Sequence, residues 1–171
     1  GDVYKRQNNL LADSELCVLI GEVLEKCGLA KNEFRIKISN RKLSKGLLED
    51  LKIKDQDQKS ITLRAIDKLD RIGNEGVKLL LGKGRKDKSG DFTEGAKLEE
   101  KQIDKISDFL NAKGLDQLEK IGCTNILFNE GILELKEMIK NFEFFKFKNF
   151  KIDPAVVRGL VYYTGPIFEA E

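Results

Sequence analysis

Strand-like patterns occur at the two ends of the chain, and a long helical region separates them. Phe34, Ile36 and Ile38 alternate with polar residues, which predicts a strand with one buried face. Residues 156–169 are β-branched and aromatic, which predicts two strand segments bent around a turn. From about Ser44 to Lys120 the pattern is short amphipathic helices with no strand alternation. This order predicts an α+β fold whose strands meet in antiparallel orientation, because regular βαβ alternation is missing.

The first helix has predicted ends. Asp13 suits the N-cap position and Gly28 suits the left-handed position after the last turn. Cys17 and Cys27 lie in this helix and are interpreted as small core residues. With Cys123 they form an odd set without CxxC spacing, which predicts neither a zinc site nor a disulfide framework.

The helical region contains a basic connection, Gly82 to Gly95, with the sequence GKGRKDKSGDFTEG. Its glycine spacing matches neither common phosphate-loop pattern. Three interpretations stay open: a phosphate-binding loop, a flexible basic turn near a nucleic acid backbone, or a solvated loop whose Phe92 anchors it to a helical core. Nearby, Ser60 is predicted to cap a helix that Gly73 closes.

Phenylalanine and lysine alternate between Phe142 and Ile152, in the sequence FEFFKFKNFKI, which predicts a strand. One interpretation places the phenylalanines in the core and the lysines in water. The other is a surface on which single-stranded nucleic acid stacks.

Composition excludes several classes of function. The 171 residues include no histidine, which excludes a Ser-His-Asp or Cys-His catalytic apparatus and a His-ligated metal within this chain. The net charge of +2 gives no overall attraction to polyanions. Neither a membrane-spanning run nor a signal sequence is visible, so a cytoplasmic protein without a membrane partner is expected.

The segment from Val157 to Gly165 differs from the rest because Arg158 stands alone among apolar neighbours. A guanidinium in such surroundings needs an anionic ligand or a buried carboxylate partner. Tyr162 and Tyr163 add rings whose hydroxyls require hydrogen-bond partners. On the residues alone, a ligand site and a structural ion pair stay equally open.

Arg158-Gly159-Leu160, Tyr162-Tyr163-Thr164-Gly165 and Phe168-Glu169 together resemble the RGLxYYTGxxFE motif of histidyl-tRNA synthetases. Upstream, Ala12 to Glu15 looks like the DAE that follows motif 2 of class II enzymes. Several further segments resemble the insertion of the alphaproteobacterial branch: Asn40 to Lys42, Arg64 to Asp70, Gly84 to Asp87 and Ser89 to Thr93. The resemblance covers the chain from about Asn8 to Glu171.

The resemblance implies an internal fragment of a class II antiparallel-sheet catalytic domain with an α-helical insertion that approaches the tRNA acceptor arm. The activity would be ATP-dependent formation of histidyl-adenylate and transfer to tRNA(His), with Mg²⁺ and a homodimer expected from the family. Arg158 matches the catalytic arginine that contacts the α-phosphate and the histidine carboxylate. Tyr162 and Tyr163 match the histidine pocket. No metal bound by the protein is expected in this chain.

The resemblance also divides the chain. Residues 1–7 would be an unassigned or non-native leader, 8–43 and 126–171 pieces of the catalytic domain, and 44–125 the insertion. The fragment alone is expected to be inactive. One alternative is a noncatalytic, histidine-sensing paralogue similar to the ATP phosphoribosyltransferase regulatory subunit, although such paralogues tend to lack the arginine and the insertion. Another is an RNA-binding module built on the insertion.

Overall fold

The computed structural model describes residues 2–157 and 164–171, with side chains described from Leu10 onward. It contains both helices and strands, which confirms the α+β class. The elements, in chain order, are α1 (Asp2–Lys26), β1 (Ile36–Asn40), α2 (Arg41–Asp50), α3 (Gln56–Asp67), α4 (Leu69–Leu81), β2 (Gly84–Lys86), β3 (Phe92–Glu94), α5 (Glu100–Asn111), α6 (Leu115–Lys120), α7 (Ile126–Phe144), β4 (Phe150–Ile152) and β5 (Pro166–Ala170).

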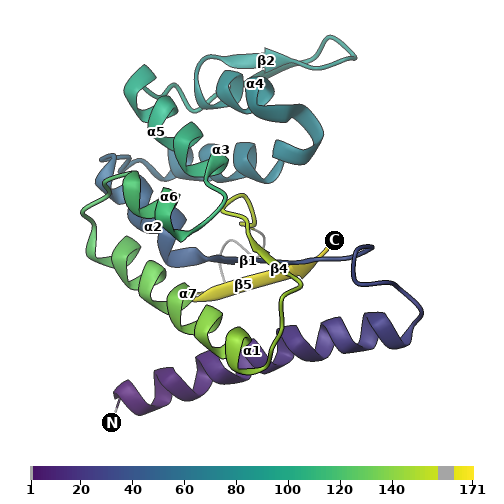
Figure 1. Ribbon diagram of the computed structural model, residues 1–171. Helices are drawn as coiled ribbons and strands as arrows, with labels where there is room; N and C mark the ends of the chain where they lie inside the picture. Colours follow the sequence, from purple (N-terminus) through teal and green to yellow (C-terminus); the bar gives the residue numbers. More distant parts are fainter. Residues whose placement is uncertain (1, 158–163) are drawn as a thin grey trace.

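A three-stranded sheet in the order β4-β1-β5 joins the two ends of the chain. In Figure 1 this sheet lies between α1 at one end and α3, α4 and α5 at the other. β5 pairs with β1 in the predicted antiparallel orientation, with Ile38 opposite Phe168. β4 instead runs parallel to β1, with Ile38 opposite Ile152, so the antiparallel prediction is wrong for this strand pair. The segment between α7 and β4 returns the chain to the same end of the sheet.

β1 is buried on both faces, which the alternation of its sequence did not predict. Lys37 and Ser39, expected in solvent, are both buried. The ammonium of Lys37 is 2.9 Å from a carboxylate oxygen of Glu171 and 3.7 Å from Asp153 and Glu169. Acidic residues of β5 and of the positions directly after β4 and β5 thus compensate the charge, so a lysine is tolerated in the central strand.

α1 ends as predicted but begins earlier. The N–H of Gly28, at φ +98°, donates to Glu25, and the N–H of Leu29 donates to Leu24. These two bonds form a Schellman motif. At the other end the helix already starts at Asp2, so Asp13 lies inside it and the prediction of an N-cap there is wrong.

Cys17 and Cys27 differ in burial. Cys17 is fully buried, as predicted, whereas Cys27, directly after the last residue of α1, is exposed, so its assignment to the core is wrong. Burial raises the pKa of Cys17 to about 12, and the nearby Asp13 carboxylate adds to this shift.

The helical region contains a β-hairpin that the sequence analysis did not predict. β2 and β3 pair in antiparallel orientation between α4 and α5. Each strand is three residues long, too short for an alternation pattern to be visible. The cap assigned to Ser60 is also wrong, because Asp55 caps α3 by accepting the N–H of Gln58 at 2.8 Å. Gly73, at φ +66°, produces a kink inside α4.

The aromatic segment is mostly not a strand. α7 continues to Phe144 and β4 begins only at Phe150, so the predicted strand over residues 142–152 is wrong except for its last three residues. Phe142 is fully buried, and its ring contacts those of Phe147 and Phe150 at centroid distances of 5.4 and 4.7 Å. These phenylalanines are packed side chains, as the core interpretation expects, although Phe144 is 81% exposed.

α2 follows β1 directly and packs along α7. The two helices approach closely at Gly46, where an added Cβ would lie 2.5 Å from the backbone nitrogen of Phe128. The middle of α2 is therefore fixed against the first turn of α7. Over the described residues, no helix has the length and apolarity that crossing a bilayer would require.

Candidate functional site

The residues predicted to form the site, Arg158, Tyr162 and Tyr163, lie outside the described residues. The structure therefore leaves their roles as predictions. It does describe the residues on both sides of them, Val157 and Thr164 to Gly165. Val157 and Gly165 both contact Arg41, the residue at which β1 passes into α2.

Arg41 bonds to both sides of this segment. Its guanidinium Nη1 donates to the carbonyl of Val157 at 2.9 Å. Its backbone N–H donates to the carbonyl of Gly165, also at 2.9 Å. Arg41 is buried, and burial lowers the pKa of its guanidinium. The group stays charged, because the ordinary pKa of a guanidinium is very high. One buried residue at the start of α2 thus holds the chain immediately before Arg158 and two residues after Tyr163.

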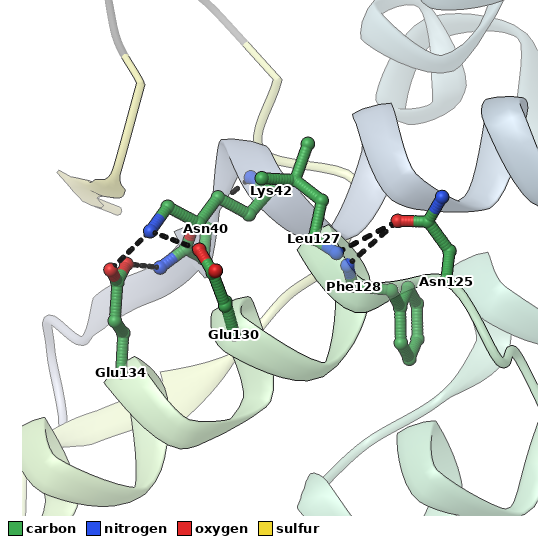
Figure 2. A network of polar contacts seen from close by, with 7 residues as sticks. All are labelled: Asn40, Lys42, Asn125, Leu127, Phe128, Glu130 and Glu134. Carbon is green, nitrogen blue, oxygen red and sulfur yellow. Dashed lines mark hydrogen bonds and ion pairs between the residues drawn. The ribbon is translucent and has the colours of Figure 1, made fainter.

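Asn40 links the start of α2 to α7. Its side-chain oxygen accepts the N–H of Lys42 at 2.9 Å and so caps α2. Its amide nitrogen donates to the Glu134 carboxylate at 2.7 Å. Figure 2 shows Asn40 and Lys42 pointing together toward the acidic side chains of α7.

Lys42 completes this polar cluster, which we define as Asn40, Lys42, Glu130 and Glu134. Its ammonium lies 2.5 Å from Glu134 and 3.0 Å from Glu130 (Figure 2). Burial alone would lower the pKa of Lys42, but hydrogen bonds and attraction from Glu134 and Glu130 outweigh it and leave the pKa raised. The lysine is therefore a buried cation compensated by two carboxylates one helical turn apart.

Asp13 of α1 lies near enough to Glu134 for the two carboxylates to repel each other. Burial, and then repulsion by Glu134, raise the pKa of Asp13 above its ordinary value. Gly165 lies on the same side, because a Cβ added there would be 3.9 Å from the Glu134 carboxylate. The polar cluster thus adjoins the segment that leads out of the motif.

The polar cluster caps the start of α2 through Asn40 and holds the charged Lys42 side chain against α7, at the end of β1. No group of three or more His, Cys, Asp or Glu side chains in the described part of the chain is placed to hold a metal ion. In the sequence, Asn40, Arg41 and Lys42 stand out only through a resemblance, and Glu130 and Glu134 do not stand out at all. The i,i+4 spacing of Glu130 and Glu134 predicts that both lie on one face of a helix, but it does not predict that Lys42 of another helix pairs with them.

The comparisons with known proteins agree with the sequence resemblance. The family model described as Histidyl-tRNA synthetase matches residues 6–170. Histidine--tRNA ligase of Brucella ovis is 43% identical over 173 residues, covering 95% of this chain and 34% of that protein. Histidine--tRNA ligase of Bartonella quintana is 45% identical over 169 residues, covering 93% and 34%. The chain therefore spans about a third of the length of the curated relatives that it matches.

Solved structures match as well. The crystal structure of histidyl-tRNA synthetase from Nostoc sp. PCC 7120 aligns with a TM-score of 0.76 at 30% identity, covering 94% of this chain and 36% of that one. A Bacillus halodurans structure, titled an ATP phosphoribosyltransferase regulatory subunit/histidyl-tRNA synthetase, aligns with a TM-score of 0.72 over 95% and 39% of the two chains. At 19% identity, the latter supports the fold alone. Since the family model covers nearly the whole chain, this chain belongs to the histidyl-tRNA synthetase family.

Proposed function

We propose that this chain is an internal part of the catalytic domain of a histidine–tRNA ligase. The observation that carries the proposal is the anchoring of both sides of the RGLxYYTG segment on Arg41, at the end of the central strand. In the longer enzyme the reaction joins histidine and ATP into histidyl-adenylate and then transfers histidine to tRNA(His). The partners are thus histidine, ATP and tRNA(His), in a homodimeric cytoplasmic enzyme.

In the proposed reaction, a carboxylate oxygen of histidine attacks the α-phosphorus of ATP. The bond between the α-phosphorus and the oxygen that bridges to the β-phosphorus breaks, and pyrophosphate leaves. Because the substrate is itself the nucleophile, the chain needs no side-chain nucleophile, in keeping with a sequence that lacks histidine. Arg158 would neutralise charge on the α-phosphate and orient the histidine carboxylate, a task that suits a planar and permanently charged fork. Tyr162 and Tyr163 would line the histidine pocket.

We further propose that residues 44–125 form the insertion that approaches tRNA and that residues 8–43 and 126–171 belong to the catalytic domain. Mg²⁺ is expected to accompany ATP in this family. The described residues offer no set of metal ligands, so no step is assigned to that ion. Since the chain covers 34% of the Brucella ovis ligase, we expect the 171-residue chain alone to lack ligase activity.

A chimera tests the proposal. The matching segment of the Brucella ovis ligase would be replaced by this chain, and histidine-dependent ATP–pyrophosphate exchange would be measured. We expect exchange in the chimera and a loss of at least about 100-fold in Arg158→Ala, as for removal of a group that stabilises transition-state charge. Near-normal exchange in Arg158→Ala would refute the role assigned to Arg158.

The alternative, a noncatalytic histidine-sensing subunit, predicts a different result. The Bacillus halodurans structure is named for an ATP phosphoribosyltransferase regulatory subunit as well as for histidyl-tRNA synthetase. The sensing function would be favoured over the ligase if the chimera binds histidine with ordinary affinity but shows no ATP–pyrophosphate exchange, and if no substitution restores the exchange.

A further inference from the structure

The proposed reaction leaves the β2–β3 hairpin unexplained. Its base is fixed on α4, because the N–H groups of Ala96 and Leu98 donate to the carbonyls of Leu80 and Leu81 at 2.8 and 3.0 Å. Gly84 permits the close approach of β2 to β3: it has φ +114°, and an added Cβ would lie 2.3 Å from the Thr93 carbonyl. The basic connection is therefore a β-hairpin whose two short strands, β2 and β3, are joined by a solvent-exposed turn at residues 87–91.

The tip of the hairpin is closed by Asp87. Its carboxylate accepts the hydroxyl and the N–H of Ser89 at 2.7 and 2.9 Å and the N–H of Asp91 at 3.0 Å. These bonds, led by the Ser89 hydroxyl, lower the pKa of Asp87. The Asp87 carboxylate is thus engaged inside the turn, where the second acid, Asp91, also accepts the Ser89 hydroxyl at 3.4 Å. Lys86 and Lys88 on either side of Asp87 are exposed.

The hairpin segment, residues 82–95, carries four cations against three acids, Asp87, Asp91 and Glu94, so its net charge is +1. Lys83, Arg85, Lys86 and Lys88 form no ion pair with any residue that the structure describes. The acidic residue of β3, Glu94, instead lies 3.8 Å from Lys97. A net positive charge on a projecting hairpin, with none of these four cations held in an ion pair by a described residue, favours a polyanionic partner.

Phe92 places an aromatic ring among these cations. It is 58% exposed, so the interpretation that it anchors a loop to the helical core is wrong. It pairs across the hairpin with Lys86. The tip of its ring lies over Gly84, 2.8 Å from the position that a Cβ would take there. An exposed ring beside exposed cations is a combination that binds unpaired nucleotides in other proteins.

We propose that the β2–β3 hairpin binds tRNA, with Phe92 stacking on an unpaired base and with Arg85, Lys86 and Lys88 contacting the neighbouring phosphates. The inference rests on the proposed function, which makes tRNA the macromolecular substrate. It goes further by naming the element and the side chains. The hairpin and α1 lie at opposite ends of the molecule (Figure 1), so α1 provides control positions.

The stacking role is tested with the whole 171-residue chain and a labelled tRNA(His) transcript. Phe92→Ala is expected to raise the Kd by about 5- to 100-fold, the range for one base–aromatic stack, and Phe92→Trp to restore it. The matched control is Phe144→Ala, which removes an 81% exposed ring from the end of α7 and leaves the Kd unchanged. Equal affinity of the Phe92→Ala and Phe144→Ala variants, or no rescue by Trp, would overturn the stack.

The phosphate contacts are tested by salt dependence. The double variant Lys86→Ala/Lys88→Ala should flatten the slope of log K against log salt by about 1.5, the value for two lost phosphate contacts. The control, Lys26→Ala/Lys31→Ala at the end of α1, should keep the slope of the parent. A slope unaltered in the hairpin variant would refute the phosphate contacts.

The ligase chimera separates this inference from the proposed function, because ATP–pyrophosphate exchange requires no tRNA. Hairpin variants should leave exchange within twofold of the parent chimera and raise the KM for tRNA in aminoacylation. An inactive chimera would contradict the proposed function, whereas Phe92-dependent tRNA binding by the 171-residue chain would still support the hairpin. An unchanged KM for tRNA in an active chimera would count against the hairpin alone.

Discussion

Replacing Glu134 by glutamine should destabilise the protein because it removes the closer partner of a buried lysine. The Lys42 side chain is 10% exposed, and its ammonium lies 2.5 Å from Glu134, which is 16% exposed. The second partner, Glu130, lies 3.0 Å away and is 38% exposed, so it compensates only part of the charge. Removing one partner of a buried ion pair costs about 3–5 kcal/mol when nothing replaces it. With Glu130 still present, we expect a loss of about 2 kcal/mol.

Urea unfolding at pH 7 measures this loss. With an m-value of about 2 kcal/mol/M, the midpoint for Glu134→Gln should fall by about 1 M. The control is Glu137→Gln on the same helix, whose partner Lys140 is 3.7 Å away and exposed, and it should cost less than about 0.5 kcal/mol. Equal midpoints for the two variants would refute the argument that burial makes the Lys42 pair important.

The pH dependence of this loss has a defined sign. The pKa of Lys42 is raised in the folded state above its ordinary 10.5, so its contribution is complete below 10.5 and disappears as pH rises through the folded value. The difference between the parent and Glu134→Gln should therefore shrink above pH 10.5. A difference that grows with pH would contradict the ion pair.

Three further changes test other parts of the fold. Asp13→Asn should raise the urea midpoint at pH 7, because a pKa raised in the folded state means that ionisation opposes folding, and this gain should vanish as pH falls toward the ordinary 3.8. Asn125→Ala removes the cap that accepts the N–H groups of Leu127 and Phe128 and should lower the free energy of unfolding by about 1 kcal/mol; a loss below about 0.3 would show that the cap is dispensable. Phe142→Ala should cost about 3–5 kcal/mol by calorimetry or urea, whereas Phe144→Ala, two residues along the same helix, should cost under about 0.5; similar values would contradict the packing described here.

Local features of the fold could be predicted from the sequence. The end of α1 depends on Gly28 and the few residues around it, so a local pattern identifies it. The RGLxYYTG segment is a contiguous motif, and its resemblance led to the family that the comparisons confirm. The roles of Arg158, Tyr162 and Tyr163 stay predictions.

Features that depend on distant residues could not be predicted. Lys37 is polar, yet it is buried because carboxylates of β5 and of segments beside the sheet surround it. Lys42 meets Glu130 and Glu134 across about ninety residues of chain. Phe142 and Phe144 favour a strand by local preference, but α7 packs against α1 and β1, and the burial of Phe142 there keeps this segment helical although Phe144 is exposed. Tertiary packing thus overrides local propensity at these positions.

Histidine-dependent ATP–pyrophosphate exchange by the ligase chimera tests the central claim most directly. We predict that the chimera exchanges with histidine at a rate within about tenfold of the Brucella ovis parent and at background level with any other amino acid, since the claim places the histidine pocket and the catalytic arginine on this chain. A folded chimera that exchanges with no amino acid would contradict it. So would one that keeps full exchange after Arg158→Ala.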